Sequence, residues 1–149
     1  MINANYRLKS FHKALYASSR LSQPERKGLA RYDWRMVNHI DVHPTNSRVI
    51  VRVGDVTVAD SNQAQVLAEG SLPPRHYFPR DHVRMDLLTA SESSTHCPYK
   101  GDASYWSMTV EGEEFEDVVW SYENPIPEMS VIAGLLCFYD EQVTVELNG

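Results

Sequence analysis

From residue 48 onward the sequence alternates short apolar runs with turn signals, and this spacing constrains the fold more than any other feature of the chain. Residues 49–53 are rich in valine and predict one strand, and residues 56–58 predict a second short strand. Gly54-Asp55 between them is a turn signal, so the two strands are typical of a β-hairpin. Further runs of this kind predict strands at 64–67, 83–88, 103–110, 115–120, 135–139 and 143–147. We therefore expect a mainly β protein with a single antiparallel β domain.

The turns between these runs predict which strands are neighbours. Glu111-Gly112 predicts a tight turn that pairs 103–110 with 115–120, and Asp140-Glu141 predicts a last hairpin of the two terminal runs. Pro73-Pro74 predicts an extended segment at 76–79. We expect a loop around Cys97 and a single helical turn near 128–131.

The first 47 residues have a different pattern. Leu8, Phe11 and Leu15 recur at helical spacing among basic residues, which predicts a short basic amphipathic helix. Residues 22–36 contain Pro and Gly breakers and predict an irregular connector. We therefore divide the chain into a basic N-terminal extension, 1–47, that is partly helical and partly irregular, and a β domain, 48–149.

Charge is unevenly distributed along the chain. Residues 1–35 hold eight of the 14 Lys and Arg but two of the 20 Asp and Glu, so the rest of the chain is strongly acidic. An acidic body argues against nucleic acid as a main partner, because phosphate contacts need basic side chains. The basic segment is expected to lie on the acidic body of its own chain or of a second subunit, which leaves a homodimer open.

Three further observations bear on the compartment. No apolar run approaches the roughly 20 residues that span a bilayer, so no membrane partner is expected. Cys97 and Cys137 are the only cysteines, which is too few for a disulfide framework, and we interpret both as reduced thiols in a cytoplasmic protein. The serine-containing, basic N-terminus also overlaps in composition with mitochondrial transit peptides, so organellar targeting stays open.

Several sequence blocks occur together in one order. They are Val58-Ala59-Asp60-Ser61, Leu72–Pro79, Val83–Leu88, Cys97–Trp106, Val119–Tyr122, Pro125, Ile132–Gly134 and Phe138-Tyr139. On these blocks the chain resembles the family catalogued as domain of unknown function 427, also labelled nucleotidyltransferase-like. The resemblance implies a small β domain of the β-tent type. Other β-tent proteins often bind zinc through two Cys-x-x-Cys pairs; this chain has no such pair, so no metal site is predicted.

The segment 96–106 combines a thiol, an imidazole, an ammonium and a carboxylate within a few residues. Cys97 could act as a nucleophile if His96 or Lys100 lowered its pKa, with Asp102 as a third catalytic group. Lys100 could bind an anionic ligand, because Gly101 beside it permits close approach. In the alternative reading Cys97 is a buried apolar residue and Lys100 a solvated charge.

Aromatic and basic side chains suggest a binding pocket. Its predicted members are Tyr77, Tyr105, Trp106, Trp120 and Tyr122, together with the cations Arg75 and Arg80. Alternation along a strand puts Tyr105 and Trp106 on opposite faces and Trp120 and Tyr122 on the same face. An aromatic cleft with a few polar groups is typical of a small-molecule site, and arginines can bind carboxylate or phosphate. Plain sheet packing is the alternative for the aromatic residues.

Histidines also lie near these elements. His76 could titrate as an acid or base near neutral pH. For Arg80, the alternative to binding a ligand is a surface ion pair with Asp81. His39 and His43 have a spacing that suits a metal only on a helix, and Asp41 and Pro44 disfavour a helix there.

The nucleotidyltransferase label is not supported by the residues themselves. Gly70-Ser71 is present, but no Asp-x-Asp follows it, and Mg²⁺ would be a cofactor only under this reading. Whether Asp81, Asp86 and Asp102 converge is left open. The leading hypothesis is a domain that binds a small anionic molecule, with catalysis undecided. The alternatives are a protein-interaction module and a nucleotidyltransferase-like enzyme.

Overall fold

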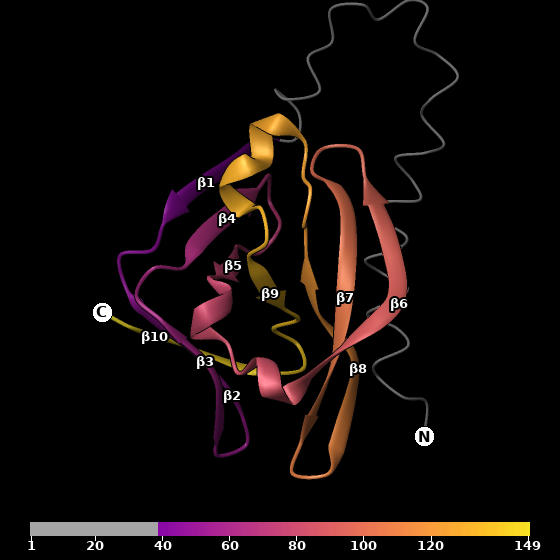
Figure 1. The fold of residues 1–149 in the computed structure, drawn as a ribbon. Helices are drawn as coiled ribbons and strands as arrows, with labels where there is room; N and C mark the ends of the chain where they lie inside the picture. The colour runs from indigo at the N-terminus through magenta and orange to yellow at the C-terminus, as the bar shows by residue number, and fades with distance from the viewer. Residues whose placement is uncertain (1–38) are drawn as a thin grey trace, which may run out of the picture.

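The computed structural model describes residues 39–149, which form two antiparallel β-sheets (Figure 1). The strands are β1 (Ile40–Pro44), β2 (Arg48–Val53), β3 (Val56–Ser61), β4 (Gln65–Glu69), β5 (Arg75–Phe78), β6 (Leu88–Cys97), β7 (Gly101–Val110), β8 (Glu113–Ser121), β9 (Leu136–Phe138) and β10 (Thr144–Asn148). The 3-10 helices are η1 (Arg80–His82), η2 (Met85–Leu87) and η3 (Pro127–Ile132). The mainly β fold class is thus confirmed, whereas the predicted N-terminal helix lies outside the described residues.

The large sheet has seven strands in the order β1-β4-β5-β9-β8-β7-β6, and the small sheet has the order β10-β2-β3. Two of the three predicted hairpins, β2–β3 and β7–β8, are present. The β7–β8 turn places Glu111 and Gly112 at positive φ, 50° and 80°, and the β2–β3 turn places Gly54 at φ 57°. Positive φ at both central residues of the β7–β8 turn, and at the first central residue of the β2–β3 turn, matches the twist of hairpin strands. Both turns therefore follow directly from the local sequence. Strand β1 lies before residue 48, at which the predicted β domain begins.

The strand predicted at 83–88 is wrong. This segment forms η1 and η2, and β6 begins only at Leu88. The reason is that its backbone bonds to the small sheet rather than to a neighbouring strand ladder: the Arg84 amide donates to the Val58 carbonyl at 2.8 Å, and Val83 forms an isolated bridge with Ala59. The loop expected around Cys97 is also shorter than predicted, because β6 extends to that residue.

The predicted C-terminal hairpin is wrong as well. Strand β9 pairs with β5 and β8 in the large sheet, whereas β10 pairs with β2 in the small sheet. The turn between them, in which the Gln142 amide donates to the Tyr139 carbonyl at 2.9 Å, directs the chain from one sheet to the other. The helical turn expected near 128–131 is present as η3.

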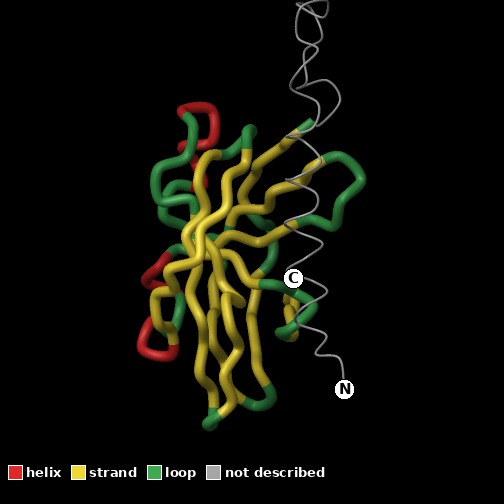
Figure 2. Tube along the Cα trace, turned by 90° about the vertical axis from the view of Figure 1, so that its right-hand side faces the viewer, coloured by secondary structure: helices red, strands yellow, loops and turns green. Residues whose placement is uncertain are grey.

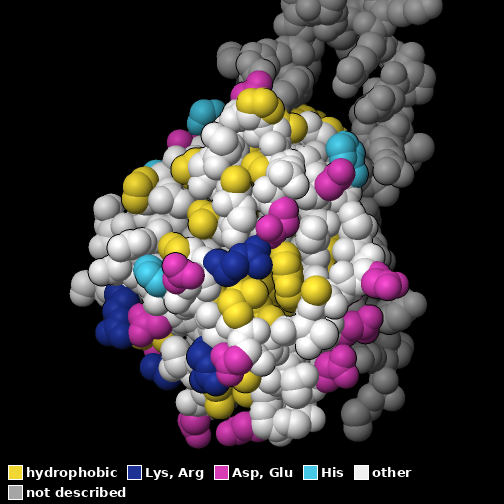
Figure 3. Space-filling model, in the orientation of Figure 1, with side chains coloured by type: hydrophobic (Ala, Val, Ile, Leu, Met, Phe, Trp, Pro, Cys, Tyr) yellow, Lys and Arg dark blue, Asp and Glu magenta, His cyan; other side chains and the backbone are white. Residues whose placement is uncertain are grey.

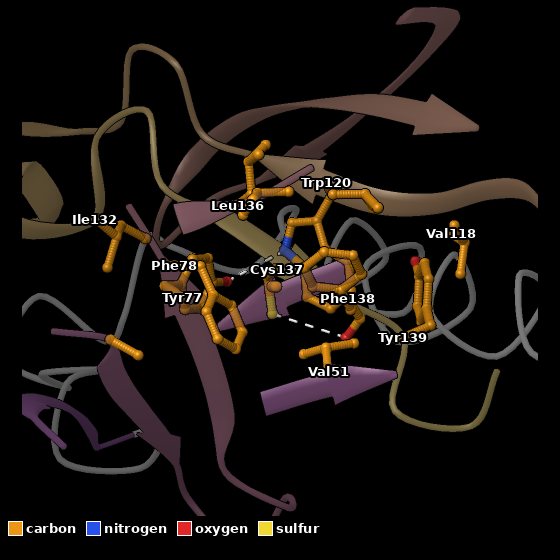
Figure 4. Packing of buried hydrophobic residues seen from close by; sticks show 14 of the residues in the cluster. Val51, Tyr77, Phe78, Val118, Trp120, Ile132, Leu136, Cys137, Phe138 and Tyr139 are labelled. Atoms are coloured by element: carbon orange, nitrogen blue, oxygen red, sulfur yellow. Dashed lines mark hydrogen bonds between the residues drawn. The ribbon is translucent and has the colours of Figure 1, made fainter. Parts of the chain in front are cut away.

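Buried apolar side chains from both sheets form one core. Val51 of β2 lies beside Phe138 of β9, and Phe78 packs edge-on against Phe138 with ring centroids 5.8 Å apart (Figure 4). Figure 2 shows the 3-10 helices on one side of the strands. No helix in residues 39–149 is long and apolar enough to cross a membrane.

Strand register defines two sides of the large sheet. Tyr105 lies opposite Trp120, Trp120 opposite Cys137, and Cys137 opposite Tyr77, so these four residues share one side, which we name the Trp120 side. Trp106 pairs with Val119 and therefore faces the other way, on the Trp106 side. The register thus agrees with the alternation predicted for Tyr105 and Trp106.

Candidate functional site

The Trp120 side carries a cluster of aromatic side chains in contact with one another. The Trp120 indole donates from Nε1 to the Tyr77 hydroxyl at 3.2 Å, as Figure 4 shows, and its ring centroid lies 4.6 Å from that of Tyr139. The Tyr105 hydroxyl is hydrogen-bonded to Oγ1 of Thr95 at 2.7 Å. Burial raises the pKa of the Tyr105 hydroxyl. These aromatic rings are almost completely buried, and charged side chains lie at the rim of the cluster.

Arg75 lies at one end of this cluster. Its guanidinium carbon sits 5.7 Å from the centre of the Trp120 ring, a cation–π geometry. It also forms ion pairs with Asp140, at 3.6 Å, and with Glu141, at 3.2 Å. The Arg75 side chain is 21% exposed, so solvent and small solutes reach it.

Lys100 lies at another point of the same side. Its side chain is only 3% exposed, and Nζ donates to Oε2 of Glu69 at 2.7 Å and sits 6.0 Å from the centre of the Tyr122 ring. The Lys100 carbonyl accepts a hydrogen bond from the Ile126 amide at 2.9 Å. The reading of Lys100 as a solvated loop charge is therefore wrong.

The residue after Lys100 explains why the chain can turn there. Gly101 has φ 115°, and a Cβ at this position would lie 3.3 Å from the Cα of Pro125. The close approach that Gly101 permits is thus made by the backbone of the following loop. Only glycine accepts both that conformation and that contact without strain.

Cys137 occupies the centre of the Trp120 side and is fully buried. Burial raises the pKa of its thiol well above the usual value, and the nearby Asp140 raises it further, while Arg75 and Lys100 act in the opposite direction. Burial also raises the pKa of Asp140, although Arg75 opposes this. The thiol is therefore protonated at neutral pH and is a poor nucleophile.

The three predicted catalytic residues do not come together. His96 and Asp102 are both exposed and face each other across β6 and β7, with Nδ1 of His96 2.6 Å from Oδ1 of Asp102. Cys97 is paired with Gly101 and is 1% exposed, so its side chain projects to the opposite side of the strand from His96. The burial matches the alternative reading of Cys97 as a small core residue.

Two of the predicted ligand-binding residues lie on the Trp106 side. The Arg80 guanidinium carbon sits 5.3 Å from the centre of the Trp106 ring, and Arg80 forms an ion pair with Glu123 rather than with Asp81. On the face seen in Figure 3, basic side chains likewise lie beside acidic and hydrophobic ones. The predicted pocket residues are therefore divided between two sides of the sheet, with Arg75, Tyr77, Tyr105 and Trp120 together.

The histidines and acidic residues give no metal centre within residues 39–149. His43 bonds to Asp41 on strand β1, not on a helix, and no group of three His, Cys, Asp or Glu side chains in this part could hold a metal ion. Burial lowers the pKa of His76. Its Nδ1 is buried without a hydrogen-bond partner.

Three residues of the Trp120 side were missed by sequence reasoning: Glu69, Cys137 and Asp140. Alternation from Leu67 and Tyr139 places the first two on a definite side of their strands, which was the available signal. The contacts themselves were not predictable, because they depend on strands far apart in the sequence.

These features define a small all-β domain whose large sheet carries an aromatic cluster with charged groups at its rim. Residues 41–149 match the family model described as Domain of unknown function (DUF427). Since this match covers most of the chain, the protein belongs to that family, as the resemblance predicted. A search of curated proteins found no match.

Proposed function

We propose that the domain binds a small anionic molecule at the Arg75 end of the Trp120 side. The observation that carries this proposal is the position of the Arg75 guanidinium, which stacks on a buried indole yet stays partly open to solvent. A guanidinium fixed by an aromatic ring keeps several N–H donors in one plane, the arrangement that recognises carboxylate and phosphate.

An incoming anion must compete with carboxylates of the protein itself. All six Lys and Arg residues between 39 and 149 are ion-paired. Arg75 pairs at 3.2 and 3.6 Å and Arg52 at 3.2 Å, whereas Arg48 and Arg84 each make two short hydrogen bonds to one carboxylate. Exchange of partners therefore costs less at Arg75 than at Arg48 or Arg84.

The environment of Asp140 makes this exchange easier. Burial raises the pKa of its carboxyl group, which means that its charged form is less well stabilised than that of an exposed aspartate. Lys100 and its buried pair with Glu69 contribute a fixed dipole on the same side of the sheet. The proposal is one of binding, and it includes no chemical step.

Benzoate and phenyl phosphate are suitable probes, titrated into the protein and followed by the amide NMR signals of β5 and residues 139–142. We expect saturable shifts that Arg75→Gln weakens roughly tenfold, the loss of one charged hydrogen bond. Glu141→Gln should strengthen binding, because it removes a competing carboxylate. Arg84→Gln, which changes an exposed arginine elsewhere, is the matched control. Equal affinity in the wild type and Arg75→Gln would refute the proposal.

A further inference from the structure

A separate pocket lies where the small sheet meets the first 3-10 helix. It has a volume of about 310 Å³ and is lined by Arg48, Asp60, Ser61, Asn62 and His82. Small-molecule sites occupy about 300 to 1,000 Å³, so this pocket suits a ligand at the small end of that range. None of its lining residues belongs to the Trp120 side.

Arg48 is held in one orientation within this pocket. Its Nε donates to Oδ1 of Asp60 at 2.7 Å and its Nη2 donates to Oδ2 at 2.5 Å. This bidentate pair uses one edge of the guanidinium and leaves the Nη1 amino group outside it. Asp60 therefore positions a cationic donor whose second edge is available to a ligand.

His82 is fixed in a similar way by Ser61, a residue that is itself 3% exposed. The Gln63 amide donates to the Ser61 hydroxyl oxygen at 2.9 Å, and this oxygen lies 2.8 Å from Nδ1 of His82. A serine oxygen has two acceptor lone pairs, so either tautomer of His82 fits this contact. In the tautomer with its proton on Nε2, the Ser61 hydroxyl donates to Nδ1 and the ring offers an N–H donor to a ligand.

The pocket offers N–H donors at three positions. They are Arg48 Nη1, the Asn62 amide group and, in the tautomer described above, His82 Nε2. Both oxygens of Asp60 accept from Arg48, and the Ser61 oxygen accepts from Gln63. Donors such as those of Arg48 and His82, each positioned by a second contact, are what an oxyanion requires.

We propose that this pocket binds the oxyanion end, phosphate or carboxylate, of a small metabolite, as a site distinct from the one at Arg75. Inorganic phosphate and acetate serve as probes at constant ionic strength, with chloride as the reference anion. The amide NMR signals of residues 60–63 and the ring signals of His82 report on binding. Saturation by phosphate but not acetate would assign a phosphate ligand, and the reverse a carboxylate.

Variants separate this proposal from a general salt effect. Arg48→Gln should weaken binding at least roughly tenfold, the effect of losing a charged hydrogen bond, and His82→Gln should weaken it as well. Arg84→Gln is the matched control, because Arg84 is an equally exposed arginine with a bidentate bond to Asp86. Shifts that chloride reproduces, an absence of saturation, or unchanged affinity in Arg48→Gln would overturn the proposal. Binding at Arg75 can fail without affecting this result.

Discussion

Replacement of Lys100 by methionine tests whether the buried ion pair with Glu69 is as deeply placed as the structure shows. Methionine has a similar length and fills the same space, so the change removes the charge with little loss of packing. Lys100 is 3% exposed and Glu69 18%, so the variant leaves a carboxylate that water reaches only partly. Removing one partner of a buried pair costs about 3 to 5 kcal/mol, and the partial exposure of Glu69 places our expectation near the lower limit.

The assay is equilibrium unfolding in urea, with the midpoint temperature as a second measure. A loss of about 3 kcal/mol corresponds to a decrease of roughly 6 to 12 °C in Tm for a domain of this size. Arg84→Met, at an exposed pair, should change stability by less than about 0.5 kcal/mol and is the control.

The double variant Lys100→Met, Glu69→Leu separates charge from packing. Replacing a whole buried pair by apolar residues is often neutral or stabilising, so the double variant should recover most of the loss. A single variant Lys100→Met that loses no more than Arg84→Met would refute the reasoning. So would a double variant that is less stable than Lys100→Met.

Three further changes have expected outcomes in the same unfolding assay. Gly101→Ala should lower the free energy of unfolding by about 1 to 3 kcal/mol, because Gly101 has a positive φ and a close backbone contact. This loss should exceed that of Gly54→Ala, where the surrounding space is open, and equal losses would contradict the reasoning. Burial lowers the pKa of His76 in the folded state, so as the pH falls below 6.5 the unfolded state binds the proton first and the folded protein loses stability. His76→Gln should therefore reduce the decrease in Tm between about pH 7.5 and about pH 5. Tyr77→Phe removes the hydroxyl that accepts from the Trp120 indole and should cost about 1 to 2 kcal/mol, and a neutral result would show that this bond adds nothing.

Local alternation was sufficient to predict which side chains share a side of a strand. Tyr105 and Trp106 point in opposite directions because successive residues alternate, whatever strand lies beside them. The Gly54 and Gly112 turns were likewise predictable, since each pairs strands that are adjacent in the sequence. The family blocks then located the segments that carry Arg75 and Lys100.

Contacts between distant segments were not predictable in this way. The segment 83–88 alternates like a strand, but its backbone bonds to β3 and forms 3-10 helices instead. Lys100 forms its buried ion pair with Glu69. Glu69 faces the same side but lies on β4, which is far from β7 in the order of the sheet. Neither the alternation nor the composition of the loop contains that information.

The placement of β10 beside β2 has a consequence for synthesis of the protein on the ribosome. The β2–β3 hairpin ends at Ser61, and the strand that completes its sheet begins at Thr144, about 80 residues later. At about 5 to 20 residues per second, the hairpin waits roughly 4 to 16 s with one edge unpaired. During that interval the nascent chain exposes an open strand edge at β2, which other chains can pair with. We therefore expect β2 to be the segment at which chaperone binding competes with aggregation.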